Sequence, residues 1–170
     1  KKPVPNVPST TCGGLAGKAA GWVLAVVPGA LFAYFVRQLP HVAEAGPIRE
    51  VTPWIPSQGL EAAFYLDGLS LLFALMVTGI GTLVVVYAGG YLAHNESLGR
   101  FYVQLFLFMG AMLGLVVADN LYLFFVFFEL TSLASYLLIG FYHTDEDNRQ
   151  AARKALVVTG GGGLALLAGL

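Results

Sequence analysis

Charged residues are scarce in this sequence. Only 11% of its 170 residues are Asp, Glu, Lys or Arg, and 57% are hydrophobic. A soluble globular domain carries about 25% charged residues, so the composition argues against a soluble domain. No cluster of basic residues is present of the kind that binds phosphate backbones, and no nucleic-acid partner is expected. The composition is that of an integral membrane protein whose surroundings include the lipid bilayer.

The residues that build cross-links, metal centres and catalytic sets are also few or scattered. A single cysteine, Cys12, excludes an internal disulfide. His41, His94 and His143 are far apart and have no ligand partners at metal spacing. The run Gly160–Gly163 does not fit the phosphate-loop pattern GxxxxGK[ST] and is expected to mark close helix packing or a local break. No metal, cofactor or catalytic triad is therefore expected.

Long apolar runs are what the sequence does contain. About 20 apolar residues cross a bilayer core as a helix, and five stretches approach or reach that length. They cover residues 15–36, 69–92, 101–118, 121–141 and 152–170. The expected fold class is therefore all-α, a polytopic transmembrane helix bundle over residues 14–170. The fifth span is incomplete at the last residue, which indicates a fragment of a larger protein.

Proline marks two connecting regions. Residues 1–13 hold three prolines among small polar residues and predict an irregular tail. Residues 37–67 hold four prolines, which argue against a long helix there. We expect a Pro-rich outer loop, with a short extended segment in EVTPWIP and a turn in QGLEAAFYLDG. Pro28 predicts a kink in the first span, which neighbouring membrane helices can tolerate.

Local signals also mark the ends and contacts of the spans. Asp67 or Ser70 can cap the exposed amides at the start of the second span. Gly110 and Gly114 have GxxxG spacing in the third span, which allows close helix contact. The two-residue break at Asp119 predicts a tight antiparallel hairpin between the third and fourth spans.

The basic residues predict an orientation. If the five spans alternate in direction, one side receives most of the Lys and Arg. One side holds Lys1, Lys2, Lys18, Arg100, Arg149, Arg153 and Lys154. The other side holds only Arg37 and Arg49. Because cytoplasmic loops carry an excess of Lys and Arg, we expect the N-terminus to be cytoplasmic. The 37–67 loop then faces outward.

Glu129 is the one formal charge in the fourth span. It lies about 12 Å from one end of that span at 1.5 Å rise per residue. A charge near the bilayer centre costs roughly 2.5–3.5 kcal/mol on translocon scales. Intramembrane ionisable residues are therefore functional candidates by default.

Hydroxyl residues share the helix face of Glu129. Residues three, four and seven positions away lie on one face, and these positions hold Tyr122, Ser132 and Tyr136 beside Phe125 and Leu133. Glu129, with Tyr122, Ser132 and Tyr136 as a supporting polar face, suits a relay that takes up and releases a proton or cation. The alternative is a permanently protonated Glu129 that serves as a structural strut. Arg153 and Lys154 are interpreted as topology anchors and not as its partners.

Three stretches resemble a known family. They are DGLSLLF (67–73), ADNLYLFFVFFELTSLASYLLIGFY (118–142) and ARKALVVTGGGGLALLAG (152–169). They resemble the antiporter-like membrane subunits shared by respiratory complex I and Mrp-type multisubunit cation/proton antiporters. The ELTS and TGGGGLALLAG segments, with GWVLAVVPGALFAYFVRQLP (21–40), are most similar to the large A subunit of Mrp antiporters. The family's first helix has no counterpart here, and Phe128 stands where the family commonly has Trp.

The resemblance implies a role for Glu129 and a setting for the chain. In the family this glutamate belongs to the ion-transfer machinery and pairs with a lysine on a later helix, outside this chain. The resemblance implies that the protein is a subunit of a secondary transporter. It would not be an enzyme and would bind no cofactor. It would exchange Na⁺, or another monovalent cation, for H⁺ in a prokaryotic plasma (inner) membrane, together with other antiporter subunits, and so serve pH homeostasis.

Two other functions stay open on the sequence. One is a proton-pumping membrane subunit of a complex I-like or hydrogenase-linked oxidoreductase, in which this chain would hold no redox centre. The other is a structural assembly subunit with a neutral Glu129.

Overall fold

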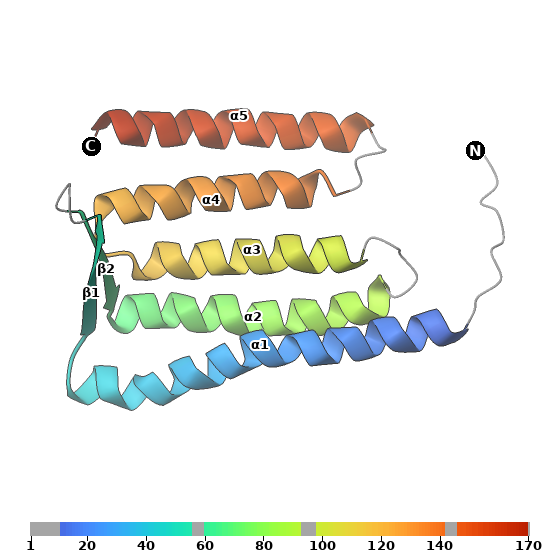
Figure 1. The fold of residues 1–170 in the computed structure, drawn as a ribbon, viewed down its shortest axis with the longest axis horizontal. Coiled ribbons are helices and arrows are strands. Elements are labelled where there is room, and N and C mark those ends of the chain that lie inside the picture. Colours follow the sequence, from blue (N-terminus) through green and yellow to red (C-terminus); the bar gives the residue numbers. More distant parts are fainter. Residues whose placement is uncertain (1–10, 56–59, 93–97, 142–145, 170) are drawn as a thin grey trace.

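A computed structural model describes residues 11–55, 60–92, 98–141 and 146–169. Its five helices lie side by side in a row, and a two-stranded hairpin closes one end (Figure 1). The helices are α1 (Thr11–Glu44), α2 (Gly68–Tyr91), α3 (Leu98–Val117), α4 (Leu121–Ile139) and α5 (Glu146–Gly169). The strands are β1 (Ile48–Ile55) and β2 (Leu60–Leu66).

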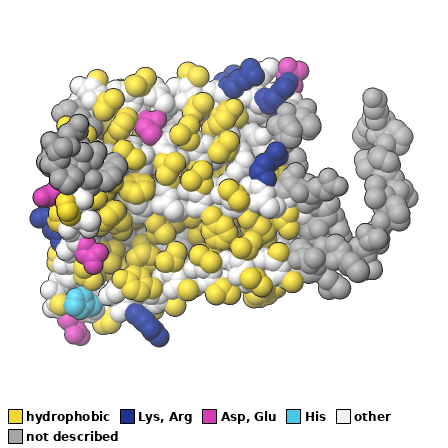
Figure 2. All heavy atoms as spheres, in the orientation of Figure 1, with side chains coloured by type: hydrophobic (Ala, Val, Ile, Leu, Met, Phe, Trp, Pro, Cys, Tyr) yellow, Lys and Arg dark blue, Asp and Glu magenta, His cyan; other side chains and the backbone are white. Residues whose placement is uncertain are grey.

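All five helices contain a stretch long and apolar enough to cross a membrane. Figure 2 shows hydrophobic side chains over the middle of the bundle, whereas the Lys and Arg side chains gather at its ends. Exposed apolar side chains at mid-helix, such as Val26, Leu83 and Val158, would be costly in water but suit a lipid environment. The chain is therefore a multi-pass membrane protein with an all-α transmembrane bundle.

Helix α1 is longer than the span expected at 15–36. It begins at Thr11, so residues 11–13 are helical and not an irregular tail; residues 1–10 lie outside the described part. It also continues to Glu44 through Pro28 and Pro40. A proline removes one backbone hydrogen bond and crowds one turn, which α1 absorbs at both positions. No long helix fills 37–67, but Pro40 does not end α1, which continues eight residues beyond the expected span.

The remainder of the expected 37–67 loop is largely a β-hairpin. Strands β1 and β2 pair antiparallel, with Ile48 opposite Leu66 and Val51 opposite Ala63. The extended segment expected in EVTPWIP lies in β1, but most of QGLEAAFYLDG, where a turn was expected, is strand β2. Strand pairing needs a partner, and here the partner lies on the far side of residues 56–59.

The hairpin is bonded to the turn between α3 and α4. The amide of Asp119 donates to the carbonyl of Ala63 at 2.9 Å. The Asp119 carboxylate also accepts a hydrogen bond from Arg49 Nε at 2.7 Å. Asn120 Nδ2 donates to the Glu61 carbonyl at 3.2 Å. These bonds fix the hairpin across one end of the helix row.

Two helices begin with side-chain caps. The Ser70 amide donates to Asp67 Oδ1 at 2.7 Å, so Asp67 caps α2. The Tyr122 amide donates to Asn120 Oδ1 at 2.8 Å, so Asn120 caps α4. The Asp119–Asn120 break therefore starts a new helix, and α3 and α4 pack together as the expected antiparallel pair.

Consecutive helices pack by placing a side chain where a glycine lacks a β-carbon. At the α1–α2 contact the Phe32 ring lies beside Gly79, 3.1 Å from the position a β-carbon would take. At the α2–α3 contact Met109 fills the space at Gly81, with Sδ 2.7 Å from that position. Glycine thus lets neighbouring membrane helices approach closely.

Candidate functional site

Glu129 lies on α4 and turns its carboxyl toward α5. The side chain is half-buried, and its Oε1 is buried with no hydrogen-bond partner among the described residues. The carboxyl occupies the space beside Gly163, where an added β-carbon would overlap Oε1 and lie 2.8 Å from Cδ. We call this space, between Glu129 and the Cα of Gly163, the glycine notch.

A second contact gives the register of α4 and α5. A β-carbon at Gly140 would lie 3.5 Å from the Cβ of Ala152. Gly140 follows Glu129 by eleven positions on α4, and Ala152 precedes Gly163 by the same number on α5. Eleven residues are close to three helical turns, so both contacts lie along one antiparallel seam.

The supporting polar face is only partly assembled. Ser132 is buried and its hydroxyl donates to the Phe128 carbonyl at 3.1 Å. Tyr136 is half-buried and lies seven positions from Glu129, on the same face of α4. Tyr122 is 52% exposed in the first turn of α4. The structure therefore places Ser132 and, in part, Tyr136 inside the helix bundle, and it leaves Tyr122 on the bundle surface.

The face of α4 opposite Glu129 is also packed. Leu123 is buried, and Phe127 fills the space at Gly114 of α3. Helix α4 thus lies between α3 and α5, and Glu129 faces α5 and not the α1–α3 core. In a row of helices α4 has one neighbour on each side. The polar residues of α4 alone could therefore not show whether they face α3 or α5.

Two hydroxyl residues near the site were not singled out from the sequence. The Thr131 side chain is buried and donates to the Phe128 carbonyl at 2.7 Å. Thr159 lies one turn from Gly163 on α5 and donates to the Ala155 carbonyl at 2.8 Å. Threonines that bond their own helix leave oxygen lone pairs free. A helical-face count from Gly163 would have found Thr159, whereas Thr131, two positions from Glu129, lies on another face of α4.

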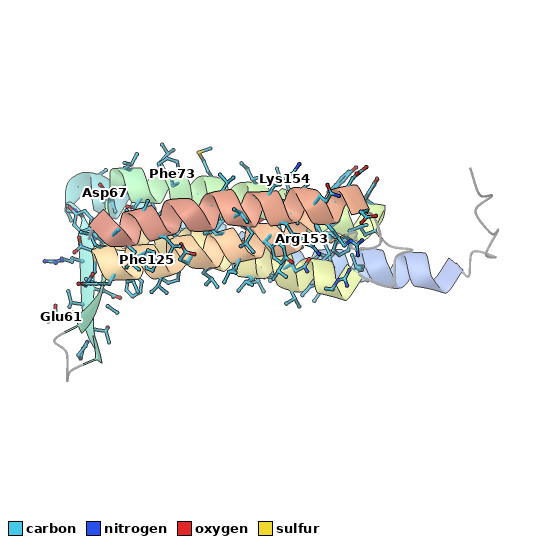
Figure 3. The ribbon with its side chains drawn as sticks, turned by 90° about the horizontal axis from the view of Figure 1, so that it is seen from above. Glu61, Asp67, Phe73, Phe125, Arg153 and Lys154 are labelled. Carbon is cyan, nitrogen blue, oxygen red and sulfur yellow. The ribbon has the colours of Figure 1, made fainter. Side chains whose placement is uncertain are left out.

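Basic residues do not reach the carboxyl within the described residues. Figure 3 shows Arg153 and Lys154 in the part of the bundle away from the hairpin, and Phe125, one turn before Glu129, nearer to it. Lys154 precedes Gly163 by nine residues, about 13 Å along a helix axis. Both basic side chains are exposed. Their position is that of groups at the end of a span.

A cation site made of several ligands is not formed by the described residues. No group of three or more His, Cys, Asp or Glu side chains comes together in them. Glu129 is therefore a single carboxyl, chemically suited to bind a proton or to share one monovalent cation with groups from elsewhere. Gln104 on α3 is the other described residue with a buried, unpaired side-chain oxygen.

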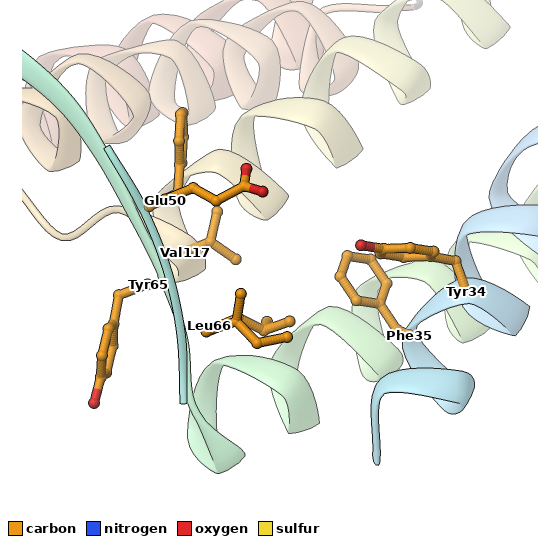
Figure 4. A pocket seen from close by; sticks show the side chains of 8 residues that line it. Tyr34, Phe35, Glu50, Tyr65, Leu66 and Val117 are labelled. Atoms are coloured by element: carbon orange, nitrogen blue, oxygen red, sulfur yellow. The ribbon is translucent and has the colours of Figure 1, made fainter. Parts of the chain in front are cut away.

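A separate cavity of about 190 Å³ lies at the hairpin end. It is lined by the end of α1, the two strands and Val117, and Figure 4 shows the Glu50 carboxylate beside it. Neither α4 nor α5 contributes a lining residue. This cavity is therefore distinct from the Glu129 site.

Family models match two parts of the chain. Residues 54–102 match the model described as NADH-ubiquinone oxidoreductase (complex I), chain 5 N-terminus. Residues 118–170, which include Glu129 and Gly163, match the model described as NADH:quinone oxidoreductase/Mrp antiporter, TM. Together the two matches cover more than half of the chain.

Curated relatives share more detailed similarity. The chain is 49% identical over 150 residues to the A subunit of the Na(+)/H(+) antiporter of Alkalihalophilus pseudofirmus, covering 88% of this chain and 19% of that protein. It is 46% identical over 149 residues to the A1 subunit of the Na(+)/H(+) antiporter of Staphylococcus haemolyticus, with the same two shares. The chain thus spans about one fifth of the length of these relatives.

A solved structure has the same arrangement of helices. The structure of the Mrp complex from Dietzia sp. DQ12-45-1b matches with a TM-score of 0.74 and 34% sequence identity. The match covers 93% of this chain and 17% of the matched chain. The fold of the row therefore recurs inside a much longer membrane subunit.

Proposed function

Because this chain belongs to the antiporter-like membrane-subunit family that complex I and Mrp antiporters share, we propose that it forms part of the large A subunit of a multisubunit Na⁺/H⁺ antiporter. The relatives described above are named as Na⁺/H⁺ antiporter subunits, which supports a secondary transporter over an enzyme. Its partners would then be the other subunits of an antiporter complex in a prokaryotic plasma membrane.

Within that complex we propose that Glu129 is an intramembrane relay for H⁺ or Na⁺. The observation that carries this proposal is its buried Oε1 in the middle of a span, which has no hydrogen-bond partner among the described residues. An unpaired polar atom in an apolar interior is costly, and binding of a proton or a cation removes that cost. Part of the side chain remains accessible in the described chain, which leaves a side from which the ion can arrive.

Ser132 and Tyr136 are proposed as supporting groups along the same helix. Both lie further along α4 toward Gly140; Ser132 is buried and Tyr136 is half-buried. Hydroxyls can accept and donate protons, so they suit a route leading from Glu129 along the α4–α5 seam. Tyr122, more than half exposed, would belong to this route only if another helix covers it.

The test is Glu129→Gln in the complete antiporter complex, assayed as Na⁺-dependent proton flux in inverted membrane vesicles. Glutamine keeps the size of the side chain and removes its proton binding. We expect flux to fall by about 100-fold, a typical contribution of a positioned proton-transfer group, with normal assembly of the complex.

Glu50→Gln is the matched control, because it neutralises a carboxyl at the separate hairpin cavity. It should leave flux near the wild-type rate. Wild-type flux in an assembled Glu129→Gln complex would instead support a structural role for a neutral Glu129.

A further inference from the structure

The geometry points to Gly163 as the positioning residue of the Glu129 carboxyl. The missing β-carbon of Gly163 leaves the space in which that carboxyl lies, so the glycine determines where the group sits between α4 and α5. This inference rests on the relay role proposed for Glu129 and adds the element that holds the relay in place.

The contact is specific to one glycine in a run of four. A β-carbon built at Gly160, Gly161 or Gly162 meets no described atom within 4 Å, whereas one built at Gly163 overlaps the carboxyl. Gly163 is also buried, and Gly161 and Gly162 are exposed. Helix formation alone would favour alanine over glycine at each of these positions. Only at Gly163 does a described contact require the absence of a side chain.

The chemistry of this contact differs from the other helix contacts. At Gly81 and Gly114 the inserted side chains are Met109 and Phe127, which gain apolar packing. At Gly163 the inserted group is a carboxyl, whose Oε1 is left without a hydrogen-bond partner in the described chain. Glycine offers no side-chain donor to this oxygen. The notch therefore fixes the position of the carboxyl without occupying the lone pairs that an ion needs.

A shift of α5 cannot accommodate a side chain at position 163 without disturbing a second contact between α4 and α5. The Gly140–Ala152 contact lies on the same α4–α5 seam, three turns from the glycine notch. Shifting α5 outward to admit a side chain at position 163 would open this contact as well. A methyl group at position 163 therefore displaces the carboxyl, the helix or both.

The test uses Gly163→Ala in the complete antiporter complex, with Gly162→Ala as the matched control on the same helix. Because a misplacement of about 1 Å can cost about 100-fold in rate, Gly163→Ala should lower Na⁺-dependent proton flux at least tenfold. Gly162→Ala adds the same methyl group where there is room, and its flux should stay within about twofold of wild type. Equal flux in the two assembled variants would overturn the inference.

Glu129→Asp separates positioning from general packing. Its side chain is one methylene shorter, so its carboxyl withdraws from the notch and leaves room for the methyl group that Gly163→Ala introduces. When Glu129→Asp and Gly163→Ala are combined, the fold-loss should be smaller than the product of the two single losses, which independent sites would give. A loss equal to that product would contradict the inference.

Assembly gives the same comparison a second readout. If Gly163→Ala blocks assembly, recovery of assembly in the double variant supports the contact, and no recovery overturns it. The relay proposal is judged separately by Glu129→Gln. Loss of flux in that variant, together with wild-type flux in Gly163→Ala, would remove the positioning role and leave the relay intact.

Discussion

Asp67 and Glu129 are two carboxyls that differ in their position on a helix and in their hydrogen bonds. Asp67 lies at the start of α2, where the Ser70 amide donates to Oδ1. That hydrogen bond is the main reason why the pKa of Asp67 is lowered from its ordinary value of 3.8. Glu129 lies within α4 and has a buried oxygen without a partner in the described chain. The first carboxyl stabilises a helix end, and the second is the proposed ion relay.

Removing the cap should weaken the start of α2. Asp67→Ala leaves the Ser70 amide without its acceptor and should lower the free energy of unfolding by about 1 kcal/mol. Asp67→Asn retains an acceptor oxygen and should cost less. Thermal unfolding of the detergent-solubilised protein measures the difference. Equal stability of Asp67→Ala and wild type at neutral pH would contradict the capping role.

The stability difference between wild type and Asp67→Asn is expected to depend on pH. Because the pKa of Asp67 is lower in the folded state, its charge contributes stability that is fully present above its unfolded value and lost as pH falls through the folded value. The stability gap between wild type and Asp67→Asn should therefore be constant above about pH 5 and close below about pH 4.

At the scale of whole elements, the sequence predicted local features better than contacts between elements. Apolar run length was enough to expect five spans, and the Asp67 cap depends on a residue only three positions away. The contact of Glu129 lies on the next helix, and the pairing of β1 with β2 depends on a register across the chain. Neither the Glu129 contact nor the strand pairing can be derived from periodicity within one segment.

The GxxxG pair in α3 illustrates the same limit. Gly110 and Gly114 have the spacing typical of close helix contact, but within the described residues only Gly114 makes one, with Phe127. A β-carbon at Gly110 meets no atom of the described chain within 4 Å. The motif identified a helix rich in small residues, and the neighbouring side chain decided which glycine is needed.

We expect alanine to distinguish these two glycines. Gly114→Ala forces the Phe127 ring to move, and overpacking of this kind costs about 1–3 kcal/mol. Gly110→Ala should be neutral or stabilise α3 by up to about 1 kcal/mol through helix propensity. Thermal unfolding of the two variants side by side measures this difference, and a larger loss for Gly110→Ala would show that another surface covers that position.

At the scale of the whole molecule, the row has two distinct ends. The hairpin and the α3–α4 turn lie at one end and are joined through Arg49 and Asp119. The C-terminal end of α4 and the start of α5 lie at the other end, near Arg153 and Lys154 (Figures 1 and 3). The excess of basic residues at the second end is evident in the sequence, and the positive-inside rule predicts that this end is cytoplasmic.

Cysteine labelling tests this orientation in cells. Glu50→Cys on the hairpin should react with a membrane-impermeant maleimide in intact cells, because Glu50 is exposed at the predicted outer end. Glu146→Cys, exposed at the start of α5, should react only after the membrane is permeabilised. The reverse pattern would place the N-terminus outside.

The main contacts of each helix are with the helix before it and the helix after it. Contacts between consecutive elements favour rapid, local folding, so each helix can join the row as the chain leaves the ribosome. Because synthesis runs from the N-terminus, Glu129 can enter the bilayer ahead of Gly163. Until α5 arrives, the carboxyl has no notch to occupy, and it must cross that interval protonated or in contact with water. The order of synthesis thus makes the completion of α5 the moment at which this acidic group acquires a fixed place.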